Sequence, residues 1–404
     1  MDFARSAHPG VQAQLDRLPS IAPPGDLLGL ERITALLDRL GRPQDTLPPV
    51  FHVAGTNGKG STVAFLRAAL EAAGHQVHAF TSPHLVRFNE RIRIAGKLVD
   101  DERLAALLGE VLDASGGIDP SFFEVATAAA LLAFARAPAS AVILEVGLGG
   151  RLDATNVVDR PLVTGIASIG IDHQAFLGET LSEIAAEKAG IAKRSVPLVS
   201  LAQPAEAEAV IERAAAEAGA PLLLEGRDWT FDPGLVPTLP GPHQVRNANL
   251  ARAMLQAQDQ LAVSREEFVK GLQSARWPAR FQRLAAGPIG DCATWVDGAH
   301  NGDAAQALAA TIAAHEPLNL ILGILANKDA EAIVEPLAAQ ALSLTFVPVA
   351  DHAHHDPHAL AARFGGRASA SLSEALQAVP EPRLVAGSLY LAGEVLALNR
   401  EVPD

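Results

Sequence analysis

The segment 50–74 most constrains what this chain can fold into, because it places a glycine-rich turn between a strand and a helix. The strand is expected at 50–54, a short, nearly continuous apolar run of the kind buried in a parallel sheet. The helix is expected from about Ser61 to Ala73, a stretch without internal glycine or proline, and Gly74 follows where a helix C-cap would lie. A buried strand followed by a turn and a helix is typical of an α/β fold.

Further apolar runs alternate with helical patterns along most of the chain. This alternation predicts parallel sheets covered by helices on both faces. The segment Thr180–Glu183 is a capping box that opens one of the helices. The other expected strands are 77–81, 141–146, 162–167 and 197–201, and then 293–297, 318–323 and 344–349.

A break in composition near 274–281 separates two alternating series of strands and helices. We therefore expect a large domain at 1–276, a linker at 277–283 and a smaller domain at 284–404. The length of 404 residues suffices for two or three domains.

Charge and hydropathy exclude several classes of protein. Lys and Arg total 32 against 46 Asp and Glu, and the net charge of −14 repels nucleic acid. The longest apolar stretch, 126–144, is interrupted by Arg136 and Pro138, which is too early for a membrane span. The opening MDFARSAHPG has no apolar signal core. These features predict a soluble, cytoplasmic protein without a nucleic acid or membrane partner.

The turn GTNGKGS, Gly55–Ser61, predicts a phosphate site. Glycines let the backbone aim N–H groups at phosphate oxygens, and Lys59 together with the helix N-terminus adds positive charge. The turn departs from the common G-x-x-x-x-G-K-[ST] form, because Val53 replaces the first glycine and Gly60 separates Lys59 from Ser61. The alternative is a glycine-rich turn without a ligand.

Two other segments follow strands of the same predicted sheet, where loops share one edge and ligands collect. The first is TSPHLVRFNER, 81–91, which could also be a proline-containing loop with a solvated charge cluster. In the second, LEVGLGGRLD, Glu145 lies within an otherwise apolar strand. An unpaired carboxylate is costly there, so either Mg²⁺ or a buried ion pair with an arginine is expected.

Other polar residues carry weaker signals when taken alone. His173 is one of 13 histidines, and Lys188 alone would more often form a salt bridge on a helix surface. In the C-terminal series, polar residues at adjacent strand ends suggest a ligand edge, with helix caps as the alternative; these are Asp297, His300, Asn301, Lys328 and Asp329. The tract 352–358 resembles a metal-binding sequence, but we interpret it as a solvated loop.

Taken together, these segments resemble the folylpolyglutamate synthase/dihydrofolate synthase family within the ATP-dependent Mur-ligase-like enzymes. The resemblance runs from about Gly29 to Val395. It is carried by GTNGKGST, TSPHLVRFNERIRI, LEVGLGGRLDATN, IGIDH with EKAGI, WPARFQ, DGAHN, GILANKD and GSLYLAGE. It implies an N-terminal P-loop ATPase domain of the Mur-ligase central type, followed by a smaller Rossmann-like α/β domain.

The resemblance also implies roles for individual residues. The phosphate loop would be Gly58, Lys59, Gly60 and Ser61, and Mg²⁺ would be held by Ser82, Glu145 and His173. Lys188, fifteen residues after His173, matches the family's carbamylated lysine. A carbamate supplies a carboxylate to Mg²⁺, whereas an ammonium repels the ion. With Lys59, Glu145 and His173, it completes the implied catalytic set.

The implied substrate and nucleotide contacts lie in both domains. The pterin is expected near Phe122, Phe123, Glu124, Arg151, Leu152 and Asp153. ATP contacts are expected at Asn247, Arg280 and Asp297, and His300 belongs to a substrate-binding motif. The linker reads WPARFQ where PGRFQ is common in the family, which removes a glycine at the expected hinge.

The implied reaction is ATP-dependent ligation of L-glutamate to dihydropteroate and to the γ-carboxylate of reduced folates, through an acyl phosphate. This is a step of folate biosynthesis and one-carbon metabolism. Small-molecule substrates, ATP, Mg²⁺ and a monomeric enzyme are therefore expected. The alternatives are another Mur-type ligase with a different acid, and an ATP-binding switch protein without ligase activity.

Overall fold

The computed structural model describes residues 5–21, 28–289 and 293–403, so the first four residues of the opening segment lie outside the described residues. The chain divides into two compact units. The first comprises the described part of 1–238 together with 245–275, and the second comprises 239–244 together with the described part of 276–403.

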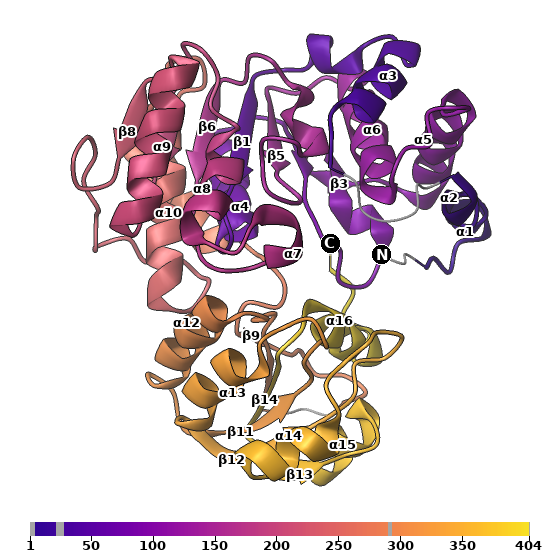
Figure 1. The fold of residues 1–404 in the computed structure, drawn as a ribbon, viewed down its shortest axis with the longest axis vertical. Coiled ribbons are helices and arrows are strands. Elements are labelled where there is room, and N and C mark those ends of the chain that lie inside the picture. The colour runs from indigo at the N-terminus through magenta and orange to yellow at the C-terminus, as the bar shows by residue number, and fades with distance from the viewer. Residues whose placement is uncertain (1–4, 22–27, 290–292, 404) are drawn as a thin grey trace. The chain divides into compact units, whose positions relative to one another are not determined.

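The first unit is built on an eight-stranded sheet with the order β4-β3-β2-β5-β1-β6-β7-β8 (Figure 1). Its six strands from β2 to β8 are parallel, and β3 and β4 add an antiparallel edge. The strands are β1 Val50–Ala54, β2 Val77–Phe80, β3 Ile92–Ile94, β4 Lys97–Leu98, β5 Ala141–Glu145, β6 Val163–Ile166, β7 Leu198–Ser200 and β8 Leu222–Leu224.

Helices cover this sheet, and the side chains of alternate strand residues decide which helices they meet. Val50, Val142 and Leu144 pack in one cluster with α3, α5 and α6, while α4 packs against β1, β2 and β5. The helices are α1 Pro9–Leu15, α2 Leu18–Ile21, α3 Glu31–Arg39, α4 Lys59–Ala72, α5 Asp101–Ala114, α6 Phe122–Ala135, α7 Gln174–Leu177, α8 Leu181–Ala189, α9 Ala205–Ala218, α10 Pro242–Gln256 and α11 Arg265–Ser274. Short 3₁₀ helices span Pro43–Thr46, Phe88–Arg91 and Ala154–Val157.

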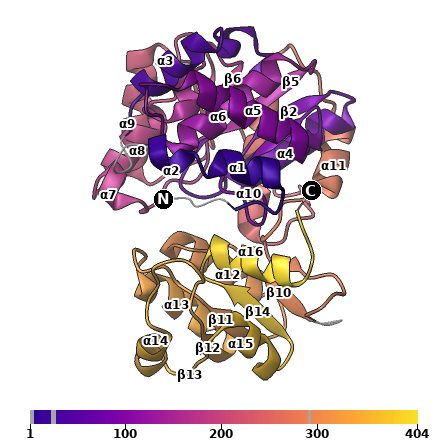
Figure 2. The same cartoon turned by 90° about the vertical axis from the view of Figure 1, so that its right-hand side faces the viewer.

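The second unit has a six-stranded sheet with the order β13-β12-β11-β14-β10-β9, parallel except for β9 (Figure 2). The strands are β9 Gln282–Arg283, β10 Thr294–Val296, β11 Leu318–Leu322, β12 Ala341–Phe346, β13 Arg367–Ala368 and β14 Arg383–Ala386. The helices are α12 Gly302–Ile312, α13 Ala330–Ala338, α14 Pro357–Phe364, α15 Leu372–Ala378 and α16 Leu389–Leu398.

The predicted α/β fold class is confirmed, and most predicted strands differ from the observed ones by one or two residues at an end. The strand predicted at 344–349 is wrong in position, because β12 begins at Ala341. Its first three residues, Ala341, Leu342 and Ser343, are not buried, whereas the buried Val347 and Val349 lie beyond its end. Within the described ranges, no helix has both the length and the apolar character needed to cross a membrane.

Candidate functional site

The glycine turn after β1 is held in shape by two neighbouring segments. Gly58 has a φ of 87°, and a Cβ there would lie 2.4 Å from Oδ1 of Asn247 on α10. The backbone N–H groups of Thr56 and Asn57 donate to the carbonyl of Ser168 after β6, at 2.7 and 3.2 Å. The turn therefore requires glycine at position 58, and Asn247, expected at the nucleotide, lies directly against it.

Two lysine amines converge on one carbonyl oxygen of this turn. Lys59 Nζ donates to the carbonyl of Gly55 at 3.0 Å, and Lys188 Nζ donates to the same oxygen at 3.1 Å. Lys188 comes from the last turn of α8 and is 4% exposed. Burial, and then the charge of Lys59, lowers the pKa of Lys188 to about 7. A substantial fraction of Lys188 is thus a neutral amine at physiological pH.

Lys59 begins α4, the helix whose N-terminus faces the turn. Its amine also donates to the carbonyl of Thr56 at 3.2 Å, so it lies folded back over the turn. Gly60 and Ser61 follow in the first turn of α4, and both are buried. Their position at a helix N-terminus is the one in which backbone N–H groups bind phosphate.

The carboxylate of Glu145 lies at the carboxyl end of β5 and is buried. The backbone N–H of Ser82, which follows the neighbouring strand β2, donates to Glu145 Oε2 at 3.2 Å. A carboxylate and a serine on one sheet edge are the oxygen donors that Mg²⁺ prefers, so this pair fits the predicted metal.

His173 lies at the start of α7 and is more exposed than Glu145. It has a φ of 54° at the start of α7, its backbone N–H donates to Asp172 Oδ1 at 2.8 Å, and its side chain is 46% exposed. Across the part of the chain that the structure describes, no group of three or more His, Cys, Asp and Glu side chains is arranged to hold a metal. The assignment of Mg²⁺ to Ser82, Glu145 and His173 therefore stays a prediction.

Asp153 organises the loop that follows Glu145. One of its carboxylate oxygens accepts the backbone N–H groups of Gly147 and Leu148 at 3.0 and 2.8 Å, and the other accepts the N–H of Thr155 at 3.0 Å. Burial raises the pKa of Asp153, and these hydrogen bonds oppose the rise. The carboxylate therefore fixes the backbone of the predicted pterin segment.

The same loop is tied to the end of α8. The backbone N–H of Arg151 donates to the carbonyl of Glu187 at 2.7 Å, and its guanidinium donates to Glu187 Oε1 at 2.7 Å. A Cβ on Gly150 would lie 2.8 Å from the carbonyl of Glu187, so only glycine permits this approach. Leu152 is half-buried in the loop. The contact places Arg151 next to the residue before Lys188.

The predicted pterin residues on α6 have different surroundings. The ring of Phe123 lies against Gly147, where a Cβ would meet its Cζ at 2.3 Å. Phe122 packs edge-on against Phe88 at 5.6 Å between ring centroids. Glu124 is buried, caps its own helix with Ser121 and accepts from Arg32 Nε at 3.1 Å. Its carboxylate is thus engaged in holding the start of α6.

The segment 81–91 is built around a partly buried glutamate and a buried arginine. Glu90 accepts the backbone N–H groups of Leu85, Val86 and Arg87 at 2.7, 2.8 and 2.6 Å, and burial raises its pKa. Arg91 is 1% exposed and donates from Nε to His84 Nδ1 at 2.8 Å. Glu90 and Arg91 are therefore engaged within the fold, whereas Arg87 is exposed.

In the second unit, Asp297 joins the segment 277–283, which the sequence predicted to be a linker, to the end of β10. Its carboxylate accepts the N–H groups of Phe281 and Ala299 at 2.7 and 2.8 Å. Burial raises the pKa of Asp297, and the positive charge of Arg280 opposes the rise. His300 Nδ1 lies 2.8 Å from the carbonyl of Gly298. Asp297 therefore ties the segment that carries Arg280 to the segment that carries His300, within the second unit.

The helix-cap alternative holds for two of the polar residues in the second unit. Asn301 accepts from the N–H of Ala304 at the start of α12, and Asp329 accepts from that of Ala332 at the start of α13. Asp297 caps no described helix and instead bonds the linker.

The linker glycine that the family resemblance implied is replaced by a strained alanine. Ala279 has a φ of 53°, in the left-handed region that disfavours side chains with a Cβ. Its N–H bonds Gln282 Oε1 at 2.9 Å, and its carbonyl accepts from Gly298 N at 3.0 Å. The surrounding hydrogen bonds hold the conformation that a glycine would adopt freely.

The histidine tract 352–358 is partly buried rather than solvated throughout. The ring of His352 stacks on Tyr390 at 3.8 Å between centroids, and His355 Nε2 lies 2.9 Å from the carbonyl of Lys328. Asp356 caps α14. These side chains are used within the fold of the second unit.

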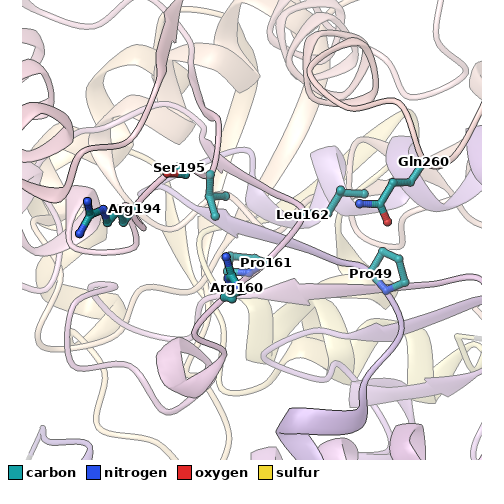
Figure 3. Close-up of a pocket in the computed structure, with 8 residues that line it drawn as sticks. Pro49, Arg160, Pro161, Leu162, Arg194, Ser195 and Gln260 are labelled. Atoms are coloured by element: carbon teal, nitrogen blue, oxygen red, sulfur yellow. The ribbon is translucent and has the colours of Figure 1, made fainter.

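An open depression lies at the amino ends of strands β1, β6 and β7 in the first unit's sheet (Figure 3). Pro49, Leu162 and Val196 line it from just before β1, β6 and β7, and Arg160 and Arg194 flank it. The glycine turn follows the carboxyl end of β1, so this depression is separate from the candidate site.

Sequence reasoning missed two buried residues next to the site, His52 on β1 and Thr155 in the 3₁₀ helix Ala154–Val157. A histidine within the apolar run VFHVA is the same kind of signal as the glutamate in AVILEV, and it could have been found in the same way.

Known proteins resemble this chain over most of its length. No protein-family model matches it. The dihydrofolate synthase/folylpolyglutamate synthase of Bacillus subtilis is 38% identical over 351 residues, covering 79% of this chain and 80% of that protein. The structure of E. coli FolC in complex with DHPP and ADP has a TM-score of 0.87 and 32% identity, covering 97% of this chain and 98% of that chain. A bifunctional folylpolyglutamate synthase/dihydrofolate synthase with Mn, AMPPNP and L-glutamate bound has a TM-score of 0.85 and 32% identity, covering 98% and 99%.

Proposed function

The chain belongs to the folylpolyglutamate synthase/dihydrofolate synthase family, and we propose that it joins L-glutamate to dihydropteroate and to the γ-carboxylate of reduced folates. It is an ATP-dependent ligase, as the sequence predicted. The observation that carries the proposal within the fold is the glycine turn with two lysine amines on one carbonyl, beside a buried carboxylate at the same sheet edge.

In the first step, an oxygen of the acid's carboxylate attacks the γ-phosphorus of ATP, and the bond from phosphorus to the ADP oxygen breaks. Two like charges 4 Å apart repel by about 4 kcal/mol at an effective dielectric constant of about 20. The ammonium of Lys59 and the N-terminus of α4 offset this repulsion. Lys59 would exchange its bonds to the carbonyls of Gly55 and Thr56 for phosphate oxygens.

We propose that Glu145 and Ser82, with His173, hold Mg²⁺ at the edge of the sheet. When bound, the ion neutralises charge on the phosphates. Glu145 supports this assignment because its buried carboxylate lies at the carboxyl end of β5, next to Ser82.

We also propose that Lys188 is carbamylated. Only a neutral amine adds to carbon dioxide, and burial lowers the pKa of Lys188 to about 7. The carbamate carries a negative charge, and the ammonium of Lys59 lies on the same carbonyl oxygen as Lys188 Nζ. The two charges would therefore stabilise one another.

In the second step, the amine of glutamate attacks the carbonyl carbon of the acyl phosphate. The carbon–nitrogen bond forms, the bond from carbon to the phosphate oxygen breaks, and the amine loses a proton. Phe122, Phe123, Arg151 and Leu152 are proposed to bind the acid, with Glu124 and Asp153 holding the segments that carry them. Arg280, Asp297, Asn247 and His300 stay predicted contacts to ATP and substrate.

The test supplies the purified protein with ATP, Mg²⁺ and labelled glutamate, and offers dihydropteroate and tetrahydrofolate separately. We expect labelled amide and phosphate with each acid. Lys59→Met is expected to lower kcat by about a hundredfold or more while leaving the thermal transition in place. ATP cleavage without any amide would favour a switch protein, and amide with a UDP-muramyl acid only would favour another Mur-type ligase.

The cytoplasmic location and the monomeric state remain predictions from the sequence. Fractionation of the source cells tests the location, and analytical sedimentation of the purified protein tests the monomer.

A further inference from the structure

A buried histidine occupies the strand that leads into the glycine turn. His52 is the third residue of β1 and is fully buried. Its neighbours in the sheet are Leu144 of β5 and Thr164 of β6. Burial, and then the charge of Lys193, lowers the pKa of His52 to about 3, so the ring is neutral at physiological pH.

The ring of His52 begins a directed chain of hydrogen bonds. His52 Nε2 lies 2.8 Å from Thr155 Oγ1. The hydroxyl of Thr155 donates its one hydrogen to Asp153 Oδ1, because a carboxylate oxygen can only accept. When Asp153 is ionised, the threonine oxygen accepts from His52, and the ring proton is then on Nε2.

The far end of this chain fixes the loop after Glu145. Asp153 Oδ2 accepts the N–H groups of Gly147 and Leu148. Gly147 in turn lies against the ring of Phe123, since a Cβ there would meet Cζ at 2.3 Å. A side chain on β1 is thus connected, through two others, to the backbone that touches Phe123.

A role in packing alone does not account for His52. Its Nδ1 has no hydrogen-bond partner among the described residues, and a buried polar atom without a partner is destabilising. An apolar side chain would fill the strand position without that cost. The hydrogen bond to Thr155 is the interaction that an apolar residue could not make.

We propose that His52 and Thr155 are positioning residues for the acid substrate: through Asp153, they hold the backbone of Gly147 and Leu148, keep Gly147 against Phe123 and so set the shape of the pterin end of the site. The inference rests on the proposed function, because it needs the acid to bind beside Phe123. It assigns no catalytic step to either residue.

Steady-state kinetics of paired variants test this inference. Thr155→Val removes the hydroxyl at nearly constant volume and Thr155→Ser keeps it; His52→Phe removes the donor and His52→Gln keeps one. We expect Thr155→Val and His52→Phe to raise KM for dihydropteroate about tenfold, with KM for ATP unchanged within about twofold. Thr155→Ser and His52→Gln should stay close to the wild type.

The matched control is His78, another fully buried histidine, on β2. Its ring nitrogens lie near the carbonyl of Ala137 and the N–H of Ala95, and it has no part in the chain to Asp153. His78→Phe should lower the thermal transition and leave KM for dihydropteroate unchanged.

Three results would overturn the inference. An unchanged KM in a folded Thr155→Val variant would reduce the chain to a structural role, and a KM raised equally in Thr155→Ser would show that the hydroxyl is not the group that acts. Wild-type protein without any dihydropteroate-dependent turnover would contradict the proposed function and this inference together. Turnover by the wild type with an unaltered Thr155→Val variant would contradict the inference alone.

Discussion

The carbonyl oxygen of Gly55 accepts hydrogen bonds from Lys59 and Lys188, two residues whose amines would repel if both were charged. The fold resolves this conflict by burying Lys188 and leaving Lys59 at the helix N-terminus. Burial is the larger cause of the lowered pKa of Lys188, and the charge of Lys59 is the second.

The lowered pKa predicts how stability depends on pH. Folded Lys188 titrates at about 7, against an ordinary value of 10.5 in the unfolded chain. Between these values the unfolded chain binds a proton that the folded protein lacks, so this residue makes stability rise with pH. From pH 7 to 9.5 the rise is on the order of 3 kcal/mol at most. Urea unfolding in carbon dioxide-free buffer measures it.

The control for this prediction is Lys188→Met, which keeps the length of the side chain and removes the titrating group. The wild type should gain stability relative to this variant as pH rises through the window. A difference between the two proteins that does not vary with pH would contradict the assignment of a lowered pKa.

The sequence identified Lys188 through its resemblance to a family motif, but it could not predict its contact. Lys188 and Gly55 are 133 positions apart, and no local pattern reports such a distance. His52 was missed although its signal was local. A polar residue within an apolar strand was taken as a sign of function only at Glu145, and His52 in β1 is the same kind of residue.

At the scale of elements, strand and helix positions were largely predictable because a buried parallel strand is a short apolar run bounded by turns. The capping box at Thr180–Glu183 begins α8 as predicted. The strands β3, β4, β8, β9 and β13 were not predicted, because each has only two or three residues and their pairing depends on the neighbouring strand. The central strand β14, four buried residues that begin with Arg383, was also missed.

The linker provides a prediction at this scale. An alanine with a positive φ lowers the free energy of unfolding by about 1 kcal/mol. A glycine avoids this strain but loses more conformational entropy on folding. Since Ala279 has a φ of 53°, the Ala279→Gly variant should have a free energy of unfolding about 0.5 kcal/mol above that of the wild type. Calorimetry of the full chain measures the shift of the transition.

Ala313, the C-cap of α12 with a φ of −58°, serves as the control within the same unit. Ala313→Gly should lower stability, because glycine gains nothing at a φ that alanine adopts without strain. Equal losses in the two variants would contradict the account of strain at Ala279.

For the whole molecule, the order of motifs along the chain was sufficient to predict the family, the α/β fold class and the ligase activity, and all three are confirmed. The reason is that most of the motifs lie at the ends of strands, as after β1, β2, β5 and β6, so that motif order and strand order are linked. The roles of Asp153 and Glu124 in holding a loop and a helix were not predictable. An acidic residue that accepts from nearby backbone N–H groups cannot be told apart, by sequence alone, from one that binds a ligand.

We propose that one oxygen of the acid's own carboxylate attacks ATP and leaves with the phosphate. Dihydropteroate labelled with ¹⁸O in its carboxylate tests it directly, by mass spectrometry of the phosphate released with ATP, Mg²⁺ and glutamate. We expect one ¹⁸O atom in each phosphate formed together with an amide bond. Unlabelled phosphate accompanying amide formation would contradict it.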